Sequence, residues 1–187
     1  MIQQETEPGL VAAAVQGNRD AYGQLVRKYQ DRLMTTVYHV VQDRTDAEDL
    51  CQEAFLRAFV HLRTFSGRSA FYTWLCRIAL NLAIGEHRRR QRLSSLESTR
   101  ESTGEEPADR GDLPGDRLVR KESLSQIQKA LAALAPDQRA VLLLRTVDGL
   151  NYQEISQVLD LNVGTVRSRL HRARMQLRDL LQNADAA

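Results

Sequence analysis

The residues with the clearest chemistry form a cationic face on a predicted helix near the end of this 187-residue chain. Val166, Leu170 and Ala173 recur at helical spacing and predict one buried stripe. The other faces of the segment carry hydroxyls and bases without any acid: Thr165, Arg167, Ser168, His171, Arg172, Arg174 and Arg178. Such a helix can lie in the major groove of DNA when a second helix positions it. The alternative is a helical hairpin whose basic surface is only solvated.

The segment just before it has the signals of a positioning helix. Asn151 suits an N-cap, and Glu154 three residues later completes a capping box. An apolar face follows, formed by Ile155, Val158 and Leu159. Asn162 then suits the cap of the next helix. Two helices joined by a short turn, the second with a cationic outer face, predict a helix-turn-helix.

A second candidate site combines aromatic rings, a loop and a run of arginines. Residues 66–69 have loop composition, and Phe71, Tyr72 and Trp74 follow at once. The helix predicted from there ends in arginines at 88–90. Rings beside a loop, followed by arginines, can stack unpaired bases and hold their backbone. The alternative is a hydrophobic core, and helical spacing places Trp74 there while leaving Tyr72 as the exposed ring.

An acidic helical face precedes this aromatic segment. It contains Asp46, Glu48, Asp49, Gln52 and Glu53. Thr45 is the predicted N-cap of the helix, with Glu48 at the capping-box position. Acids near a helix N-terminus are explained by the helix dipole alone. Because they continue to Glu53, beyond the first turn, a polar docking surface for a partner is the second interpretation.

The sequence contains no recognisable catalytic arrangement. Its four histidines belong to different predicted units, and it has no HExxH motif, phosphate-binding Gly-rich loop or nucleophile elbow. Asp46, Glu48 and Asp49 fall on a helix and not in a calcium-binding loop. We therefore expect no enzymatic activity, no metal and no cofactor.

Charge and cysteine content indicate what kind of protein this is and in which compartment it works. The formal net charge is only +2, so the total charge does not predict a partner. The positions of the acids and the arginines along the chain do. Cys51 and Cys76 stand alone and far apart, which disfavours a disulfide framework or zinc site and favours a reducing compartment. No signal-peptide pattern and no bilayer-spanning apolar run is present. We expect a cytoplasmic protein that does not insert into a membrane.

Helical periodicity and helix breakers divide the chain into two small helical domains, 1–92 and 121–187. Asp20 is the predicted cap of a long helix in the first domain, and Pro136 suits the first turn of a helix in the second. Residues 93–120 lose the periodicity, and their Gly, Pro, Ser and acidic residues predict a flexible linker. The predicted fold class is all-α, with the helix-turn-helix in the C-terminal domain.

Three stretches together carry the signature of a known family. They are DAEDLCQEAFLRAF at 46–59, FSGRSAFYTWLCRIALN at 65–81, and LAPDQRAVLLLRTVDGLNYQEISQVLDLNVGTVRSRLHRAR at 134–174. In this order and spacing they resemble region 2 and region 4 of bacterial sigma factors of the extracytoplasmic-function (ECF) group, over nearly the whole chain. The resemblance implies a protein that binds core RNA polymerase and directs promoter-specific initiation at the −10 and −35 elements.

Matching positions imply roles for individual residues. The acidic face, Asp46, Glu48, Asp49, Gln52 and Glu53, would dock on polymerase. The unpaired −10 strand would bind to a loop that receives a flipped base and to the basic end of a helix. The residues implied are Phe65, Arg68, Ser69, Tyr72, Asn81, Arg88, Arg89 and Arg90. The −35 duplex would meet Thr165, Arg167, Ser168, His171 and Arg172. Many relatives carry arginine directly after the loop phenylalanine, whereas Ser66 stands here, so the base preference of the pocket stays open.

Two other functions fit parts of the sequence. A helix-turn-helix repressor or activator needs only the C-terminal domain, and a scaffold could use both domains to hold protein partners. Neither explains an aromatic loop beside a cationic helix together with an arginine-rich recognition face. The resemblance also implies an anti-sigma partner, although nothing in the sequence identifies one.

Overall fold

The computed structural model describes residues 6–97 and 125–185, and every regular element in these ranges is a helix. In chain order they are α1 (Glu7–Val15), α2 (Arg19–Val41), α3 (Arg44–His61), the 3-10 helix η1 (Leu62–Thr64), α4 (Phe71–Glu97), α6 (Pro136–Thr146), α7 (Tyr152–Leu159) and α8 (Val163–Asp185). Residues 125–132 are also helical. The all-α prediction is confirmed. Of the expected linker, residues 93–97 continue α4, and 98–120 lie outside the described residues.

Helices α1 to α4 form the N-terminal unit, with α2 at its centre. Leu25, Leu33 and Val37 on α2 are fully buried, and they pack with the buried residues of α3 and α4. The cap of α2 is Asn18, whose side chain accepts from the backbone N–H groups of Asp20 and Ala21, both at 3.0 Å. The prediction of Asp20 as the cap was therefore wrong by two residues.

Helix α3 lies close to α2 and α4 because the residues facing them are small. Ala47, Ala54 and Ala58 are fully buried along one side of α3. Its cap is Asp43, which accepts from the N–H of Asp46 at 2.7 Å, and not Thr45 as predicted. The residue types alone could not decide between Asp43 and Thr45, because Asp and Thr are both common N-cap residues.

The helix-turn-helix is present as predicted. Asn151 and Glu154 form a capping box at the start of α7. Asp160 ends α7 in the left-handed conformation (φ 52°), which turns the chain toward α8. Asn162 then accepts from the N–H of Thr165 at 3.2 Å, so it caps α8. Pro136 occupies the first turn of α6, also as predicted.

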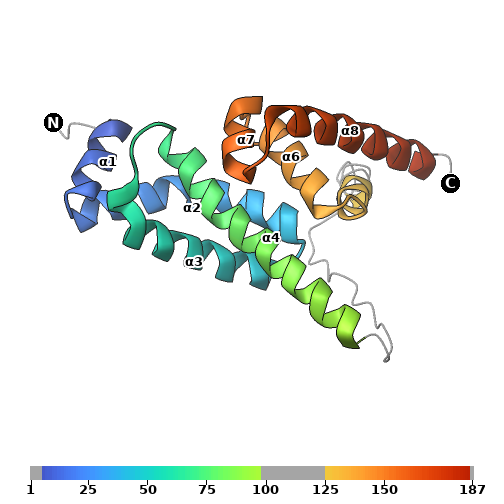
Figure 1. Cartoon of the computed structure of the whole chain (residues 1–187), viewed down its shortest axis with the longest axis horizontal. Helices are drawn as coiled ribbons and strands as arrows, with labels where there is room; N and C mark the ends of the chain where they lie inside the picture. Colours follow the sequence, from blue (N-terminus) through green and yellow to red (C-terminus); the bar gives the residue numbers. More distant parts are fainter. Residues whose placement is uncertain (1–5, 98–124, 186–187) are drawn as a thin grey trace, which may run out of the picture.

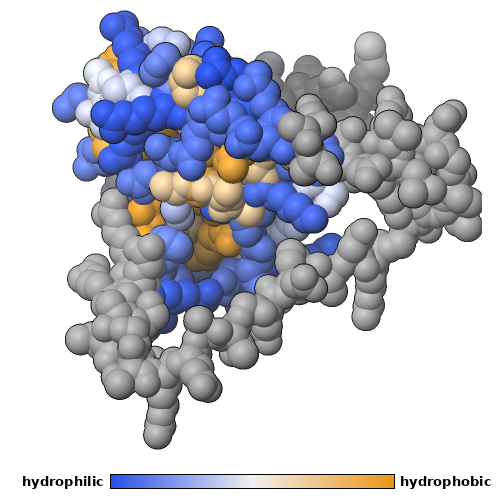
Figure 2. All heavy atoms as spheres, turned by 90° about the vertical axis from the view of Figure 1, so that its right-hand side faces the viewer, coloured by the Kyte–Doolittle hydropathy of each residue, from blue (hydrophilic) through white to orange (hydrophobic). Residues whose placement is uncertain are grey.

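The two halves of the described chain pack directly against each other. Helix α7 lies along α4 and α6 lies against α2 (Figure 1), and the buried residues of both halves form one continuous cluster. The sequence predicted two tethered domains and gave no sign of this contact. Seen from the end of α8, the described surface is mainly hydrophilic, with hydrophobic residues gathered toward its middle (Figure 2).

Both cysteines lie inside the N-terminal unit as free thiols. Cys51 is 7% exposed on α3, and Cys76 is fully buried on α4. Burial raises the pKa of each thiol to about 12. Among the described residues, no group of His, Cys, Asp and Glu could hold a metal ion, and no helix is long and apolar enough to cross a membrane.

Candidate nucleic-acid interface

The cationic face of α8 is exposed, and the stripe beneath it is buried. Val166, Leu170 and Ala173 are at most 2% exposed and fix α8 against α6 and α7. The side chains predicted to contact the −35 element then lie outside: Arg167, Ser168, His171 and Arg172 are exposed, and Thr165 is partly buried. The fold therefore presents positive charge and hydrogen-bond donors on one helix that a second helix supports, as groove binding requires.

The polar residues of this face divide into two groups. The Thr165 hydroxyl donates to Asn162 at 2.8 Å, and the Ser168 hydroxyl donates to the Thr165 carbonyl at 3.1 Å, so both are engaged within the helix. The Arg167 guanidinium lies 5.8 Å from the centre of the Tyr152 ring. His171 and Arg172 make no polar contact with any described residue, which leaves them free for an outside partner.

Arg172→Ala should weaken binding of the polymerase-bound protein to its −35 duplex by about 1–3 kcal/mol and relax base preference at one position. Fluorescence anisotropy against duplexes changed at each −35 position measures this. Arg174→Ala is the matched control, because it removes the same charge from the opposite flank of α8. It should weaken all duplexes equally, as a phosphate contact does. A preference that shifts with Arg174 and not with Arg172 would reverse the two assignments.

The loop between η1 and α4 is held by a cluster of three aromatic rings. The Phe65 ring centre lies 5.9 Å from that of Phe71 and 5.2 Å from that of Trp74, and Phe71 and Trp74 are 5.8 Å apart. Gly67 turns the loop with φ +70°, a backbone conformation that glycine adopts without strain. The cluster therefore anchors both ends of the loop, as a preformed pocket requires.

A cavity of about 380 Å³ opens beside this loop, within the usual range for small-molecule sites. Its lining is formed by Thr64, Phe65, Ser66, Arg68, Ser69, Thr73, Trp74, Arg77 and Gln157. Three predicted site residues, Phe65, Arg68 and Ser69, are thus brought together. Arg77 was missed because a single arginine inside an apolar helical pattern resembles an ordinary solvated residue. Gln157 was missed because it comes from α7, in the other half of the chain.

Asn81 does not line the cavity. It is exposed on α4, four residues after Arg77 and seven after Trp74, so the three share one side of the helix. A strand entering the cavity could follow this side toward the basic end of α4. The predicted role of Asn81 at the flipped base stays a prediction.

Asn81→Ala should leave closed-complex formation nearly unchanged and slow promoter opening by about tenfold, if its amide bonds the unpaired strand. Permanganate footprinting of unpaired thymines over time measures opening, and a gel shift at low temperature measures the closed complex. Since Asn81 is exposed, its loss should not destabilise the fold. Unchanged footprinting kinetics would remove Asn81 from the site.

The prediction that Tyr72 is an exposed ring was wrong for this arrangement of the chain. Tyr72 is 3% exposed, with its ring 5.3 Å from that of Tyr29 and under the Arg32 guanidinium at 3.8 Å. Its hydroxyl donates to Asp148 of the C-terminal half at 2.6 Å. At Tyr72, α4 is covered by α2 on one side and by the C-terminal half on another, so this ring has no exposed face.

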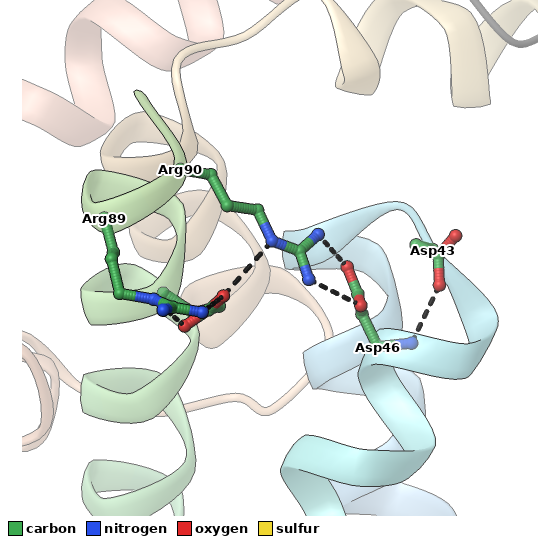
Figure 3. A network of polar contacts seen from close by, with 5 residues as sticks. Asp43, Asp46, Arg89 and Arg90 are labelled. Atoms are coloured by element: carbon green, nitrogen blue, oxygen red, sulfur yellow. Dashed lines mark hydrogen bonds and ion pairs between the residues drawn. The ribbon is translucent and has the colours of Figure 1, made fainter. Parts of the chain in front are cut away.

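The arginines at the end of α4 already have acidic partners (Figure 3). Arg89 makes two hydrogen bonds to Glu86, at 3.0 and 2.8 Å. Arg90 bonds both carboxylate oxygens of Asp46 at the start of α3, and also Glu86 at 3.2 Å. The side chain of Arg88 lies outside the described part of the structure. These pairs hold α4 against α3 and reduce the positive charge open to phosphate, so the phosphate contacts of Arg88, Arg89 and Arg90 stay predictions.

The acidic face of α3 is partly engaged as well. Asp46 is bound by Arg90, Glu48 by Arg44 at 2.9 Å, and Glu53 by Arg57 at 2.6 Å. Asp49 and Gln52 are exposed. Exposed pairs within one helix are worth only about 0.3–0.5 kcal/mol, so Glu48 and Glu53 can exchange partners easily.

An apolar groove borders this acidic face between α2 and α3. Glu48 and Gln52 line it together with aromatic and aliphatic residues, among them Tyr22, Val26, Met34, Phe55, Leu56 and Phe59. Leu56 and Phe59 are 63% and 44% exposed, and Val60 beside them is 72% exposed. Exposed apolar side chains gathered in a groove and edged by acids are typical of a protein-docking surface. The acids could be predicted from the sequence, whereas the groove could not, because its walls come from two helices.

Models of two known protein regions match the two halves of the chain. The profile of Sigma-70 region 2 matches residues 25–93, and that of Sigma-70, region 4 matches residues 124–177. The chain is 36% identical over 187 residues to the RNA polymerase sigma-H factor of Pseudomonas aeruginosa, covering 97% of each protein. It is also 36% identical to the ECF RNA polymerase sigma-E factor of Escherichia coli, over 97% of each, and to SigW of Bacillus subtilis, over 89% of this chain and 92% of SigW.

Two solved structures share the fold. One is the sigma factor RpoE of Bartonella quintana in complex with the anti-sigma factor NepR, with a TM-score of 0.68, 27% identity, and coverage of 86% of this chain and 96% of RpoE. The other is CnrH in complex with the cytosolic domain of CnrY, with a TM-score of 0.67, 28% identity, and coverage of 93% and 96%.

Proposed function

Because this chain belongs to the ECF group of sigma-70 factors, and so directs promoter-specific transcription by RNA polymerase, we propose which of its surfaces performs each step. The groove between α2 and α3, with the acidic face beside it, docks on core polymerase. The cavity at the η1–α4 loop receives an unpaired base of the −10 element. The exposed face of α8 lies in the major groove at the −35 element.

The observation that carries this assignment is the separation of the surfaces by charge. The docking groove is apolar with an acidic edge that includes Glu48 and Asp31, and would repel DNA. The loop cavity contains Arg68 and Arg77 beside the Phe65 and Trp74 rings, the combination that stacks a base and neutralises its phosphate. Flipping out a base costs a few kcal/mol, so a preformed aromatic pocket favours the opened strand.

Two further features follow from the family. The family is not one of enzymes, and we propose that the chain has no catalytic activity of its own and works in the cytoplasm beside RNA polymerase. We also propose an anti-sigma partner for it. This is supported by the likeness to RpoE and CnrH, each solved in a complex whose partners are the anti-sigma factor NepR and the cytosolic domain of CnrY.

The experiment that tests the function compares the protein with and without core polymerase, by gel shift and run-off transcription on promoter DNA. The protein alone should bind duplexes weakly, with strong salt dependence and little selectivity. Adding core polymerase should produce promoter-specific transcripts. Tight, selective binding by the protein alone, with no gain from polymerase, would instead indicate a helix-turn-helix repressor or activator.

A further inference from the structure

Two side chains that the sequence assigned to different surfaces meet in one ion pair (Figure 3). Asp46 was expected at the polymerase-docking face of α3, and Arg90 at the DNA-binding end of α4. The two terminal nitrogens of the Arg90 guanidinium donate to the two carboxylate oxygens of Asp46, one of them at 2.8 Å. Two parallel bonds of this kind fix the orientation of both side chains as well as their distance.

The ion pair belongs to a larger network. The Arg90 Nε donates to Glu86 at 3.2 Å, and Arg89 donates to the same carboxylate. Asp46 is fixed by its own helix as well, because its backbone N–H donates to the side chain of Asp43. The bond to Asp46 raises the pKa of Arg90 above its ordinary value. An isolated exposed pair contributes little to stability, but a bidentate pair within a network is the exception.

The Asp46 carboxylate lies on the side of α3 that faces α4. Asp46 lines a small cavity together with Leu50 and residues of α4. Glu48 and Gln52 line the docking groove with residues of α2 instead. At about 100° per residue, these two positions lie about 120–160° around α3 from Asp46. The ion pair is therefore directed at α4, whereas the groove opens between α3 and α2.

Packing between α3 and α4 is incomplete beneath the ion pair. The cavity there has a volume of about 50 Å³, and Val41, Leu50 and Ala83 are among its apolar lining residues. Side chains that interdigitate closely fix the angle between two helices, and a gap of this size leaves that angle less restricted. The direction of the basic end of α4 relative to α3 then depends on the bidentate pair.

The two helices joined in this way have different tasks in the proposed function. Helix α3 forms one wall of the docking groove, and α4 carries the loop cavity at its start and the basic segment at its end. A change in the angle between them displaces the DNA-binding helix relative to the polymerase. Displacements of about 1 Å in the groups that act on a substrate can lower a rate substantially.

We propose that Asp46 and Arg90 form a joint that sets the angle between the docking helix α3 and the DNA-binding helix α4. Both are positioning residues: Asp46 does not contact polymerase, and Arg90 does not contact phosphate. Docking is left to the exposed residues of the acidic face, Asp49 and Gln52, together with the groove. The proposal rests on the proposed function, in which α3 docks and α4 receives the opened strand.

An exchange of the two charges tests the joint. Asp46→Asn and Arg90→Gln each break the pair, whereas Asp46→Arg with Arg90→Asp rebuilds it in reverse. With core polymerase, each single variant should slow promoter opening about fivefold in permanganate footprinting, and the exchanged pair should open within about twofold of the natural protein. Affinity for core polymerase and the urea midpoint of the free protein should stay close to those of the natural protein in all three variants.

The angle can be measured without DNA or polymerase. Spin labels on Thr45→Cys of α3 and Gly85→Cys of α4 report the distance between the helices by pulsed electron paramagnetic resonance. Both positions are exposed, and Gly85 has open space for a side chain. Cys51 and Cys76 react slowly with the label, because burial raises the pKa of both thiols. The distance distribution should be narrow in the natural and exchanged pairs and broader in the single variants.

Arg44→Gln is the matched control for Arg90→Gln. It also removes one positive charge and one ion pair, but that pair, with Glu48 at 2.9 Å, stays within α3. Promoter opening and the label distance should remain those of the natural protein.

Three results would overturn the joint. An unchanged label distance in both single variants would show that the pair does not set the angle. A restored distance in the exchanged pair without restored opening would show that Arg90 itself contacts the strand. A large loss of core affinity in Asp46→Asn would place Asp46 in the docking surface. Because the label measurement needs neither polymerase nor DNA, it decides whether the joint exists even if the assignment of the groove or the cavity fails.

Discussion

Reversing the charge at Asp49 and Glu53 together is expected to reduce polymerase-dependent transcription by about a hundredfold or more. Both residues are on α3 beside the apolar groove, at i and i+4, so they present two negative charges to one partner surface. Like charges brought together at an interface cost several kcal/mol, and each 1.4 kcal/mol is about a factor of ten in affinity. Run-off transcription and the affinity for core polymerase measure the loss in Asp49→Lys, Glu53→Lys.

The fold should tolerate this change. Within the described part of the chain, the pair makes one polar side-chain contact, the exposed Glu53–Arg57 bridge, which is worth well under about 1 kcal/mol. Asp20→Lys with Gln24→Lys is a matched control, an exposed pair at the same spacing on α2. It should leave transcription and core affinity close to those of the natural protein. Equal losses in both doubles would show a general effect of added charge and remove α3 from the docking surface.

Phe71→Ala should have the largest effect on stability, lowering the free energy of unfolding by about 3–5 kcal/mol. Phe71 is 2% exposed and its ring contacts those of Phe65, Trp74 and Tyr29. Truncation leaves a cavity at the point where the loop is anchored, so strand opening should be lost with stability. Urea unfolding followed by circular dichroism measures the change.

The same truncation at Phe59 is the control. Phe59 is 44% exposed on α3, so Phe59→Ala removes far less buried area and should cost about 1 kcal/mol. Comparable losses at Phe71 and Phe59 would mean that the aromatic cluster does not anchor the loop. The expected difference is large enough to separate the two variants beyond the error of extrapolation.

The parts of this molecule that the sequence predicted are those set by neighbours along the chain. The capping box of Asn151 and Glu154, the cap at Asn162 and the buried stripe of α8 all depend on residues within a few positions. Local rules therefore predicted the helix-turn-helix correctly. At the start of α2 and of α3, two residues that can serve as N-cap stand two positions apart. In each helix the first of them is the cap and the second was predicted.

The errors came from contacts between distant segments. Tyr72 and Asp148 are 76 residues apart, and Thr36 and Asp148 are 112 apart, so no periodicity connects them. In sequence Asp148 precedes a glycine and resembles an ordinary turn acid, although its side chain is fully buried. The predicted set of cavity residues was incomplete for the same reason. Gln157 joins the lining only because α7 packs on α4.

The burial of Cys51 and Cys76 has a consequence for oxidative stress. Thiolates react with peroxides and disulfides, whereas thiols do so slowly. Because burial raises the pKa of both thiols to about 12, the thiolate form is rare at neutral pH. Neither sulfur can therefore act as a fast peroxide sensor while the N-terminal unit is folded. If the genes under this factor answer to oxidants, fast oxidation of these two thiols is not the step that starts the response.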